Sequence, residues 1–164
     1  MKRGDEILRT LQEQRTHEGD TPKKPSANEP FVATSENSGV TMRLEIDDFD
    51  RHGVVLREIA IRITTARKPT LDEWVARLKG ISALPAEVQL IEHDSTSSQV
   101  VFRTRPDTMG RFVELRLDRG SVLTLVCFAV DKRTNKRQRT AVNMSRDSFV
   151  MLVDELCEPI ESSS

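Results

Sequence analysis

Five cationic side chains lie within eight consecutive residues of the C-terminal half: Lys132, Arg133, Lys136, Arg137 and Arg139. The apolar run Val122–Val130 precedes them, and we expect Lys136–Met144 to return beside it, so the cluster is predicted to form the tip of a β-ribbon. Cationic groups on a projecting tip suit contact with phosphates. The same charges also stop a protruding edge from pairing with another chain. The sequence leaves both interpretations open.

Basic residues are also concentrated before the hairpin. From Ser98 to Thr140 the chain has ten Lys/Arg and four Asp/Glu, a balance of +6, whereas the whole chain has a net charge of −1. Such a local field acts over about a Debye length, roughly 8 Å at physiological salt. We therefore expect one basic surface rather than a basic protein. Beside the five hairpin cations, its contributors are Arg103, Arg105, Arg111 and Arg116.

Aromatic side chains are scarce, which limits base stacking. The chain has no Tyr, one Trp and six Phe. Phe112 is the best candidate for an exposed ring, because alternation along Phe112–Asp118 places it on the same face as Glu114 and Arg116. One or two rings make a small stacking surface. Phosphate contacts are therefore expected to supply most of any affinity for nucleic acid.

No residue pattern in the chain indicates catalysis or a bound metal. The three histidines lack ligand spacing, and Asp48–Gly53 departs from a calcium loop where His52 replaces an oxygen ligand. Glycine-rich phosphate loops and nucleophile motifs are absent. Cys127 and Cys157 are expected to be reduced packing residues. We therefore expect no enzyme activity, no cofactor and no metal.

The expected elements follow from apolar periodicity and turn chemistry. Thr70 and Glu73 form a capping box for a helix that Gly80 ends, and Ser145 caps a second helix carrying Phe149. The expected strands are Met42–Asp47, Val54–Thr64, Val88–His93, Gln99–Arg105, Phe112–Asp118, Val122–Val130 and Lys136–Met144. The sequences at the two helix starts are weakly similar at an offset of 75 residues, which aligns Thr70 with Ser145 and Trp74 with Phe149. This similarity predicts either two strand-then-helix halves or shared capping chemistry alone.

These elements predict an α+β domain over residues 41–158. We expect a largely antiparallel sheet, one inserted helix and a C-terminal helix packed on the sheet, followed by a flexible tail over residues 159–164. Residues 1–40 are expected to be a disordered arm, because residues 18–39 are nearly devoid of apolar side chains. Within the arm, Ile7, Leu8 and Leu11 share one helical face. They indicate either a frayed segment or a short docking helix.

The C-terminal half resembles two families that bind single-stranded nucleic acid. Gly110–Leu115, after the Arg105–Asp107 turn, is similar to the GRF-type strand of purine-rich-element-binding (PUR) repeats. The run from Val122 through the basic hairpin to Phe149 resembles the end of the positive-cofactor-four family, and Whirly proteins share its ββββα unit. The resemblance covers Ser98 to Cys157. It implies binding of single strands through a basic, aromatic sheet face and packing as a dimer or a tandem repeat.

The leading functional hypothesis is a noncatalytic module that binds single-stranded DNA or RNA. The alternative is a protein–protein interaction module whose partner is a second copy or an acidic protein. Continuous basic charge beside an exposed Phe112 favours nucleic acid, whereas an exposed apolar face favours protein. The chain contains no run of about 18 apolar residues, so the sequence predicts no membrane span. The N-terminus lacks a secretory apolar segment, so a cytoplasmic location without a membrane partner is expected.

Overall fold

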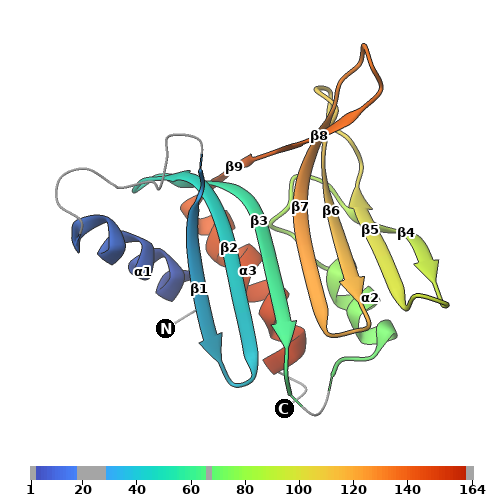
Figure 1. The fold of residues 1–164 in the computed structure, drawn as a ribbon, viewed down its shortest axis with the longest axis horizontal. Coiled ribbons are helices and arrows are strands. Elements are labelled where there is room, and N and C mark those ends of the chain that lie inside the picture. Colours follow the sequence, from blue (N-terminus) through green and yellow to red (C-terminus); the bar gives the residue numbers. More distant parts are fainter. Residues whose placement is uncertain (1–2, 18–28, 66–67, 162–164) are drawn as a thin grey trace.

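The computed structural model of the chain describes residues 3–17, 29–65 and 68–161. Its centre is a curved sheet with the helices on one side (Figure 1). Within the described residues the sheet has nine strands, with the continuous path β1-β2-β3-β7-β6-β5-β4. Every pairing between them is antiparallel. The expected α+β class with a largely antiparallel sheet is confirmed.

Two antiparallel meanders build this sheet and meet at its centre. The first meander consists of β1 (Phe31–Asn37), β2 (Val40–Phe49) and β3 (Gly53–Ile63). The second consists of β4 (Val88–Asp94), β5 (Gln99–Thr104), β6 (Arg111–Asp118) and β7 (Val122–Val130). β3 and β7 pair where the meanders meet. The prediction that Val122–Val130 is a central strand is therefore confirmed.

A helix follows each meander and begins at the predicted cap. Helix α2 (Leu71–Lys79) has a complete capping box, in which the Thr70 hydroxyl accepts from the Glu73 amide at 3.2 Å and Glu73 Oε2 accepts from the Thr70 amide at 3.1 Å. Helix α3 (Arg146–Glu161) begins after Ser145, whose Oγ accepts from the Ser148 amide at 3.1 Å. Side-chain oxygens thus satisfy amides that the first helical turn leaves unpaired.

Each helix packs against a strand of the other meander. Helix α2 follows the first meander but contacts β4 of the second, whereas α3 follows the second meander and contacts β3 of the first. The helices also contact each other behind the sheet (Figure 1). This topology agrees with two strand-then-helix halves. It also makes the two halves one folding unit, because neither half keeps its own helix.

The N-terminal expectations were wrong in two respects. Residues 31–37 form edge strand β1, which pairs with β2 over its whole length, so residues 31–39 are not a disordered linker. Helix α1 (Arg3–His17) packs on α3 and β1, and Ile7, Leu8 and Leu11 are buried. A Cβ added at Gly4 would lie 2.6 Å from Val150 Cα, so glycine permits this close approach. The short docking helix is therefore the correct alternative.

The outer limits of the domain change accordingly. The domain includes α1 and β1 in addition to residues 41–158. Helix α3 continues to Glu161, into the region expected to be a flexible tail. Residues 18–28 and 162–164 lie outside the described residues.

The sheet forks at the end that carries the basic hairpin. β3 pairs with β7 only from Glu58 to Arg62. Beyond this stretch β7 pairs with β8 (Arg137–Thr140), and β3 pairs with β9 (Val142–Ser145). The expected single return strand Lys136–Met144 is thus wrong, because the chain leaves β7 at Ala141 and crosses to β3 (Figure 1).

The core lies between the sheet and the helices. Trp74 of α2, Phe102 of β5 and Phe149 of α3 are fully buried there. Both cysteines are buried and neither forms a disulfide bond, as expected. Among the described residues no helix has the length and hydropathy needed to cross a membrane. No helix of the described chain covers the opposite face of the sheet, which we call the open face (Figure 1).

Candidate nucleic-acid interface

Two phenylalanines occupy the open face near the fork. The register of β6 and β7 places Phe112 opposite Phe128, and the rings stack with centroids 5.6 Å apart. Arg103 lies over Phe112 at 5.8 Å and Arg137 lies over Phe128 at 4.4 Å, both within cation–π range. Only 9% of Phe112 is exposed. The expected exposed ring is therefore incorrect, because the Phe128 ring and the Arg103 guanidinium group cover it.

Glu114 organises the arginines beside these rings. Its carboxylate accepts from Arg103 Nε at 2.7 Å, from Arg137 at 2.9 Å and from Arg116 at 3.1 Å. The Glu114 side chain is 4% exposed, whereas its three partners are between 39% and 46% exposed. One acid thus holds three arginines on the sheet and compensates one of their three charges.

The environment of Glu114 favours its ionised form. Burial raises the pKa of this carboxyl group, but the hydrogen bonds and charges of Arg103 and Arg137 outweigh burial and lower the pKa from its ordinary value of 4.5. The acid is therefore ionised at neutral pH. Its partners use few of the five N–H donors that each guanidinium carries, so donors remain for an external anion.

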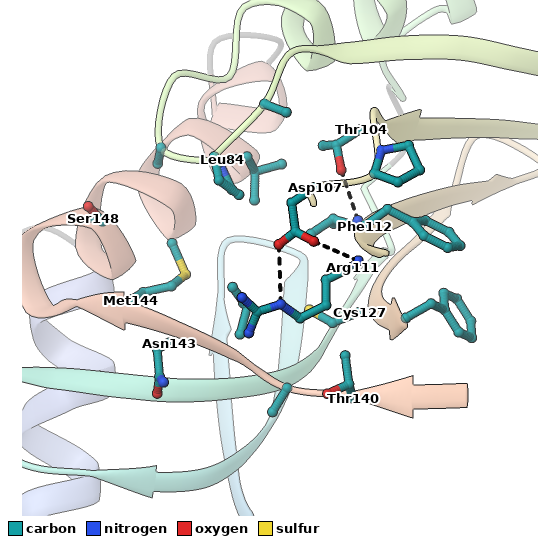
Figure 2. A pocket seen from close by; sticks show the side chains of 18 of the residues that line it. Leu84, Thr104, Asp107, Arg111, Phe112, Cys127, Thr140, Asn143, Met144 and Ser148 are labelled. Carbon is teal, nitrogen blue, oxygen red and sulfur yellow. Dashed lines mark hydrogen bonds and ion pairs between the residues drawn. The ribbon is translucent and has the colours of Figure 1, made fainter. Parts of the chain in front are cut away.

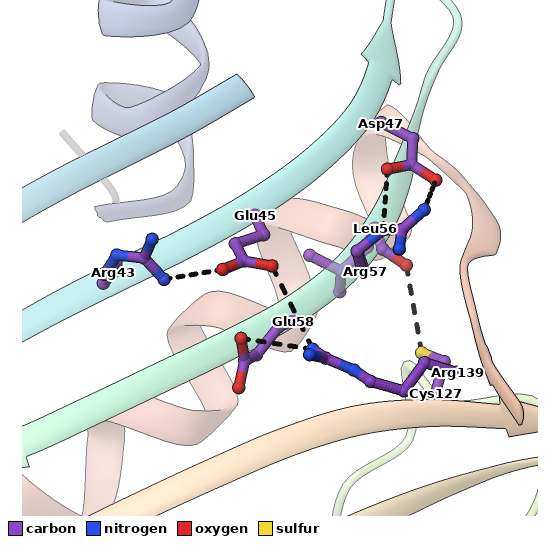
Figure 3. Close-up of polar contacts among 8 residues, drawn as sticks. All are labelled: Arg43, Glu45, Asp47, Leu56, Arg57, Glu58, Cys127 and Arg139. Atoms are coloured by element: carbon purple, nitrogen blue, oxygen red, sulfur yellow. Dashed lines mark hydrogen bonds and ion pairs between the residues drawn. The ribbon is translucent and has the colours of Figure 1, made fainter. Parts of the chain in front are cut away.

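A second ionic network on the open face neutralises Arg139. Arg139 lies 3.2 Å from Glu58 and 4.0 Å from Glu45, and Glu45 also accepts from Arg43 at 2.8 Å (Figure 3). Arg139 was expected to act with the hairpin cations. The fork instead places it toward β2 and β3, where two carboxylates compensate its charge.

The hairpin tip presents the remaining cations. Lys132, Arg133 and Lys136 are exposed in the turn between β7 and β8. The turn is held by the Asp131 amide, which donates to Lys136 O at 2.9 Å, and by the Asn135 amide, which donates to Asp131 O at 2.8 Å. Lys132 Nζ donates to Thr108 O at 3.4 Å, which joins the tip to the loop before β6. The turn that carries these three exposed residues projects above the fork (Figure 1).

A groove of about 570 Å³ lies between the hairpin and the β4–β5 end of the sheet. We call it the arginine groove. Arg105 in its wall is exposed and has no ion pair in the described part of the chain. No Asp or Glu is among the described lining residues. They are Gln89, Ile91, Arg103, Thr104, Arg105, Pro106, Phe112, Val130, Asn135 and Arg137.

A second hollow, which we call the fork cleft, has a volume of about 640 Å³ and lies where β8–β9 crosses from β7 to β3. Arg111 on its rim is held by Asp107, whose Oδ2 accepts from Arg111 Nε at 3.2 Å (Figure 2). Cys127 also lines it, and burial raises the pKa of that thiol to about 12. The fork cleft shares Thr104, Arg105, Pro106 and Phe112 with the arginine groove.

The structure thus sorts the ten expected site residues into distinct places. Arg103, Arg105, Arg137 and Phe112 meet in the arginine groove, Arg111 lies on the fork cleft, Arg116 joins Glu114 on the open face, and Arg139 belongs to the second network. Lys132, Arg133 and Lys136 form the tip.

Sequence reasoning missed Glu114 as an organiser of the site. The available signal was a single acid on the same face as Phe112 and Arg116, within the basic stretch Ser98–Thr140. Its cross-strand partner, Arg103, follows only from the β5–β6 register.

Comparisons with protein families, with curated proteins and with solved structures give no match for this chain. Among the described residues, no three His, Cys, Asp or Glu side chains gather in a way that could hold a metal ion.

Proposed function

We propose that this protein is a noncatalytic module that binds single-stranded nucleic acid through the arginine groove and the hairpin tip. The observation that carries the proposal is the uncompensated charge at this end of the sheet. Arg105 and the tip cations have no carboxylate partner in the described chain, and no acid lines the groove. Phosphodiesters are the anions best suited to such a row of guanidinium and ammonium groups.

The groove also supports a preference for single strands over duplexes. Pro106 and Val130 provide an apolar wall beside the arginines. Unstacked bases can pack on such a surface, whereas a duplex hides the faces of its bases. The small aromatic area means that phosphate contacts supply most of the affinity, so binding is expected to depend strongly on salt.

The proposal is tested by fluorescence anisotropy with a labelled oligothymidine. Arg105→Ser and the triple change Lys132→Ser, Arg133→Ser, Lys136→Ser are expected to weaken binding and to flatten the salt dependence. The log–log slope is expected to change by about 0.7 for each phosphate that the variant no longer neutralises. Arg62→Ser is the matched control, because Arg62 is exposed at the opposite end of β3. Equal losses in Arg62→Ser and Arg105→Ser would contradict the proposed site.

A second candidate function, association with another protein, is favoured by strand β4. This strand lies at the edge of the sheet, and Leu90 and Ile91 are 43% and 50% exposed. An exposed apolar edge strand can pair with a strand of another chain. Light scattering of the wild type and of Ile91→Lys tests this function. A dimer that Ile91→Lys dissociates, together with absent oligonucleotide binding, would favour it over the first candidate.

A further inference from the structure

We propose that the fork cleft receives one unstacked base of the bound strand while the arginine groove holds the neighbouring phosphates. This inference rests on the proposed function and specifies where a base is read. The two hollows are neighbours, because Thr104, Arg105, Pro106 and Phe112 line both of them. A strand whose phosphates lie in the groove therefore has a base close to the cleft.

The walls of the fork cleft suit the faces of a heterocycle. Leu84, Pro85 and Ala86 line it on the loop between α2 and β4, and Val113 lies on β6. Its volume of about 640 Å³ falls in the range of sites that bind small organic molecules, about 300–1,000 Å³. A flat base can exclude water from such apolar walls, which favours its burial.

Polar groups at the β8–β9 wall suit the edge of a base. Strand β9 pairs with β3 along one edge, and no strand of the described chain pairs with its other edge. Thr140 and Asn143 on this segment also line the cleft (Figure 2). Ser145 is a third polar lining residue. The Asn143 side chain is exposed and can both donate and accept. These groups can pair with the donors and acceptors that a base presents at its edge.

The charges around the opening also fit this assignment. Arg105 lines both hollows, so it can contact the phosphate next to the inserted base. Asp107 lies on the rim, but it is engaged by Arg111 and by the amides of Met109 and Arg111 at 2.9 Å. The rim acid is thus compensated within its own loop and does not leave an isolated negative charge at the opening.

The experiment compares an oligothymidine with an abasic oligomer of the same length. The wild type is expected to bind the oligothymidine about tenfold or more tightly, as contacts to one base allow. Ala86→Phe and Ala141→Phe fill the cleft from two different segments and should lower this ratio while leaving abasic binding unchanged. Ala76→Phe, on the exposed surface of α2, is the matched control and should keep the wild-type ratio.

The outcomes separate this inference from the proposed function. Binding of neither oligomer by the wild type would overturn the function itself. Equal binding of both oligomers would leave the function standing and overturn the base site. The base site would also be overturned if both filled-cleft variants keep the wild-type ratio of oligothymidine to abasic affinity and the wild-type melting temperature. The base would then bind elsewhere. If one variant fails to fold, the other gives the answer, because each fills the cleft from a separate segment.

Discussion

Replacing Glu114 with glutamine should lower stability and raise affinity for nucleic acid at the same time. The substitution removes the one carboxylate that Arg103, Arg116 and Arg137 share at 2.7–3.1 Å. Each arginine is more than a third exposed and can hydrate after the change. Because exposed ion pairs contribute about 0–1 kcal/mol each, the expected loss is about 2 kcal/mol in the free energy of unfolding. That corresponds to a fall of roughly 4–8 °C in melting temperature.

The stability difference between wild type and Glu114→Gln should also depend on pH. Folding lowers the pKa of Glu114 from 4.5, so the ionised acid is the form that folding favours. Its contribution is complete above pH 4.5 and is lost as the pH falls through the lower folded pKa. Thermal unfolding at neutral and acidic pH should therefore show the two proteins converging as the pH drops below 4.5.

The opposite effect is expected for binding. Without Glu114, the three guanidinium groups are free to bind phosphates, and the log–log salt slope should steepen by about 0.7 for each additional phosphate that they neutralise. Glu36→Gln is the matched control, because it removes the same charge from an exposed position on edge strand β1, at the far side of the sheet. Unchanged stability, or oligonucleotide affinity that falls below that of wild type, would refute the role assigned to Glu114.

Other perturbations test the remaining structural assignments. Trp74→Ala should lower the free energy of unfolding, measured by chemical denaturation, by about 3–5 kcal/mol, because this fully buried ring fills the core. An unchanged free energy would show that the position assigned to α2 is wrong. Leu11→Ala should lower the free energy of unfolding by about 2–5 kcal/mol in the same assay, because Leu11 is buried where α1 docks. An unchanged free energy would contradict the docking of α1. Cys127 and Cys157 should resist a thiol reagent at neutral pH and react after unfolding, because both are buried and the Cys127 pKa is raised to about 12. Rapid labelling of the native protein would contradict that burial.

Local signals in the sequence predicted much of the fold. The Thr70–Glu73 capping box, the Ser145 cap and the alternation along Phe112–Asp118 each depend on residues a few positions apart. Sequence reasoning therefore placed the corresponding elements correctly. Strand β1 was missed because only Phe31 and Ala33 mark the buried side of Phe31–Asn37, and the residues from Thr34 onward are all polar.

The candidate site depends on contacts that no local pattern specifies. Arg103 meets Glu114 through the β5–β6 register, and Arg139 meets Glu58 because the chain changes partner at Ala141. The cluster of five cations could therefore be recognised in the sequence. The sequence could not show which of the five a carboxylate neutralises. Burial of Phe112 under Arg103 and against Phe128 likewise required the three-dimensional register.

The location of bound nucleic acid is tested most directly by a two-dimensional amide NMR titration of the protein with unlabelled oligothymidine at low salt. We predict shifts at Arg103, Arg105, Phe112 and the hairpin tip, with the amides of α1 and the far edge strand β1 unperturbed. Reversal of these shifts on adding salt is expected, because phosphate contacts carry most of the affinity. No shifts at saturating oligonucleotide, or shifts confined to α1 and α3, would contradict the account.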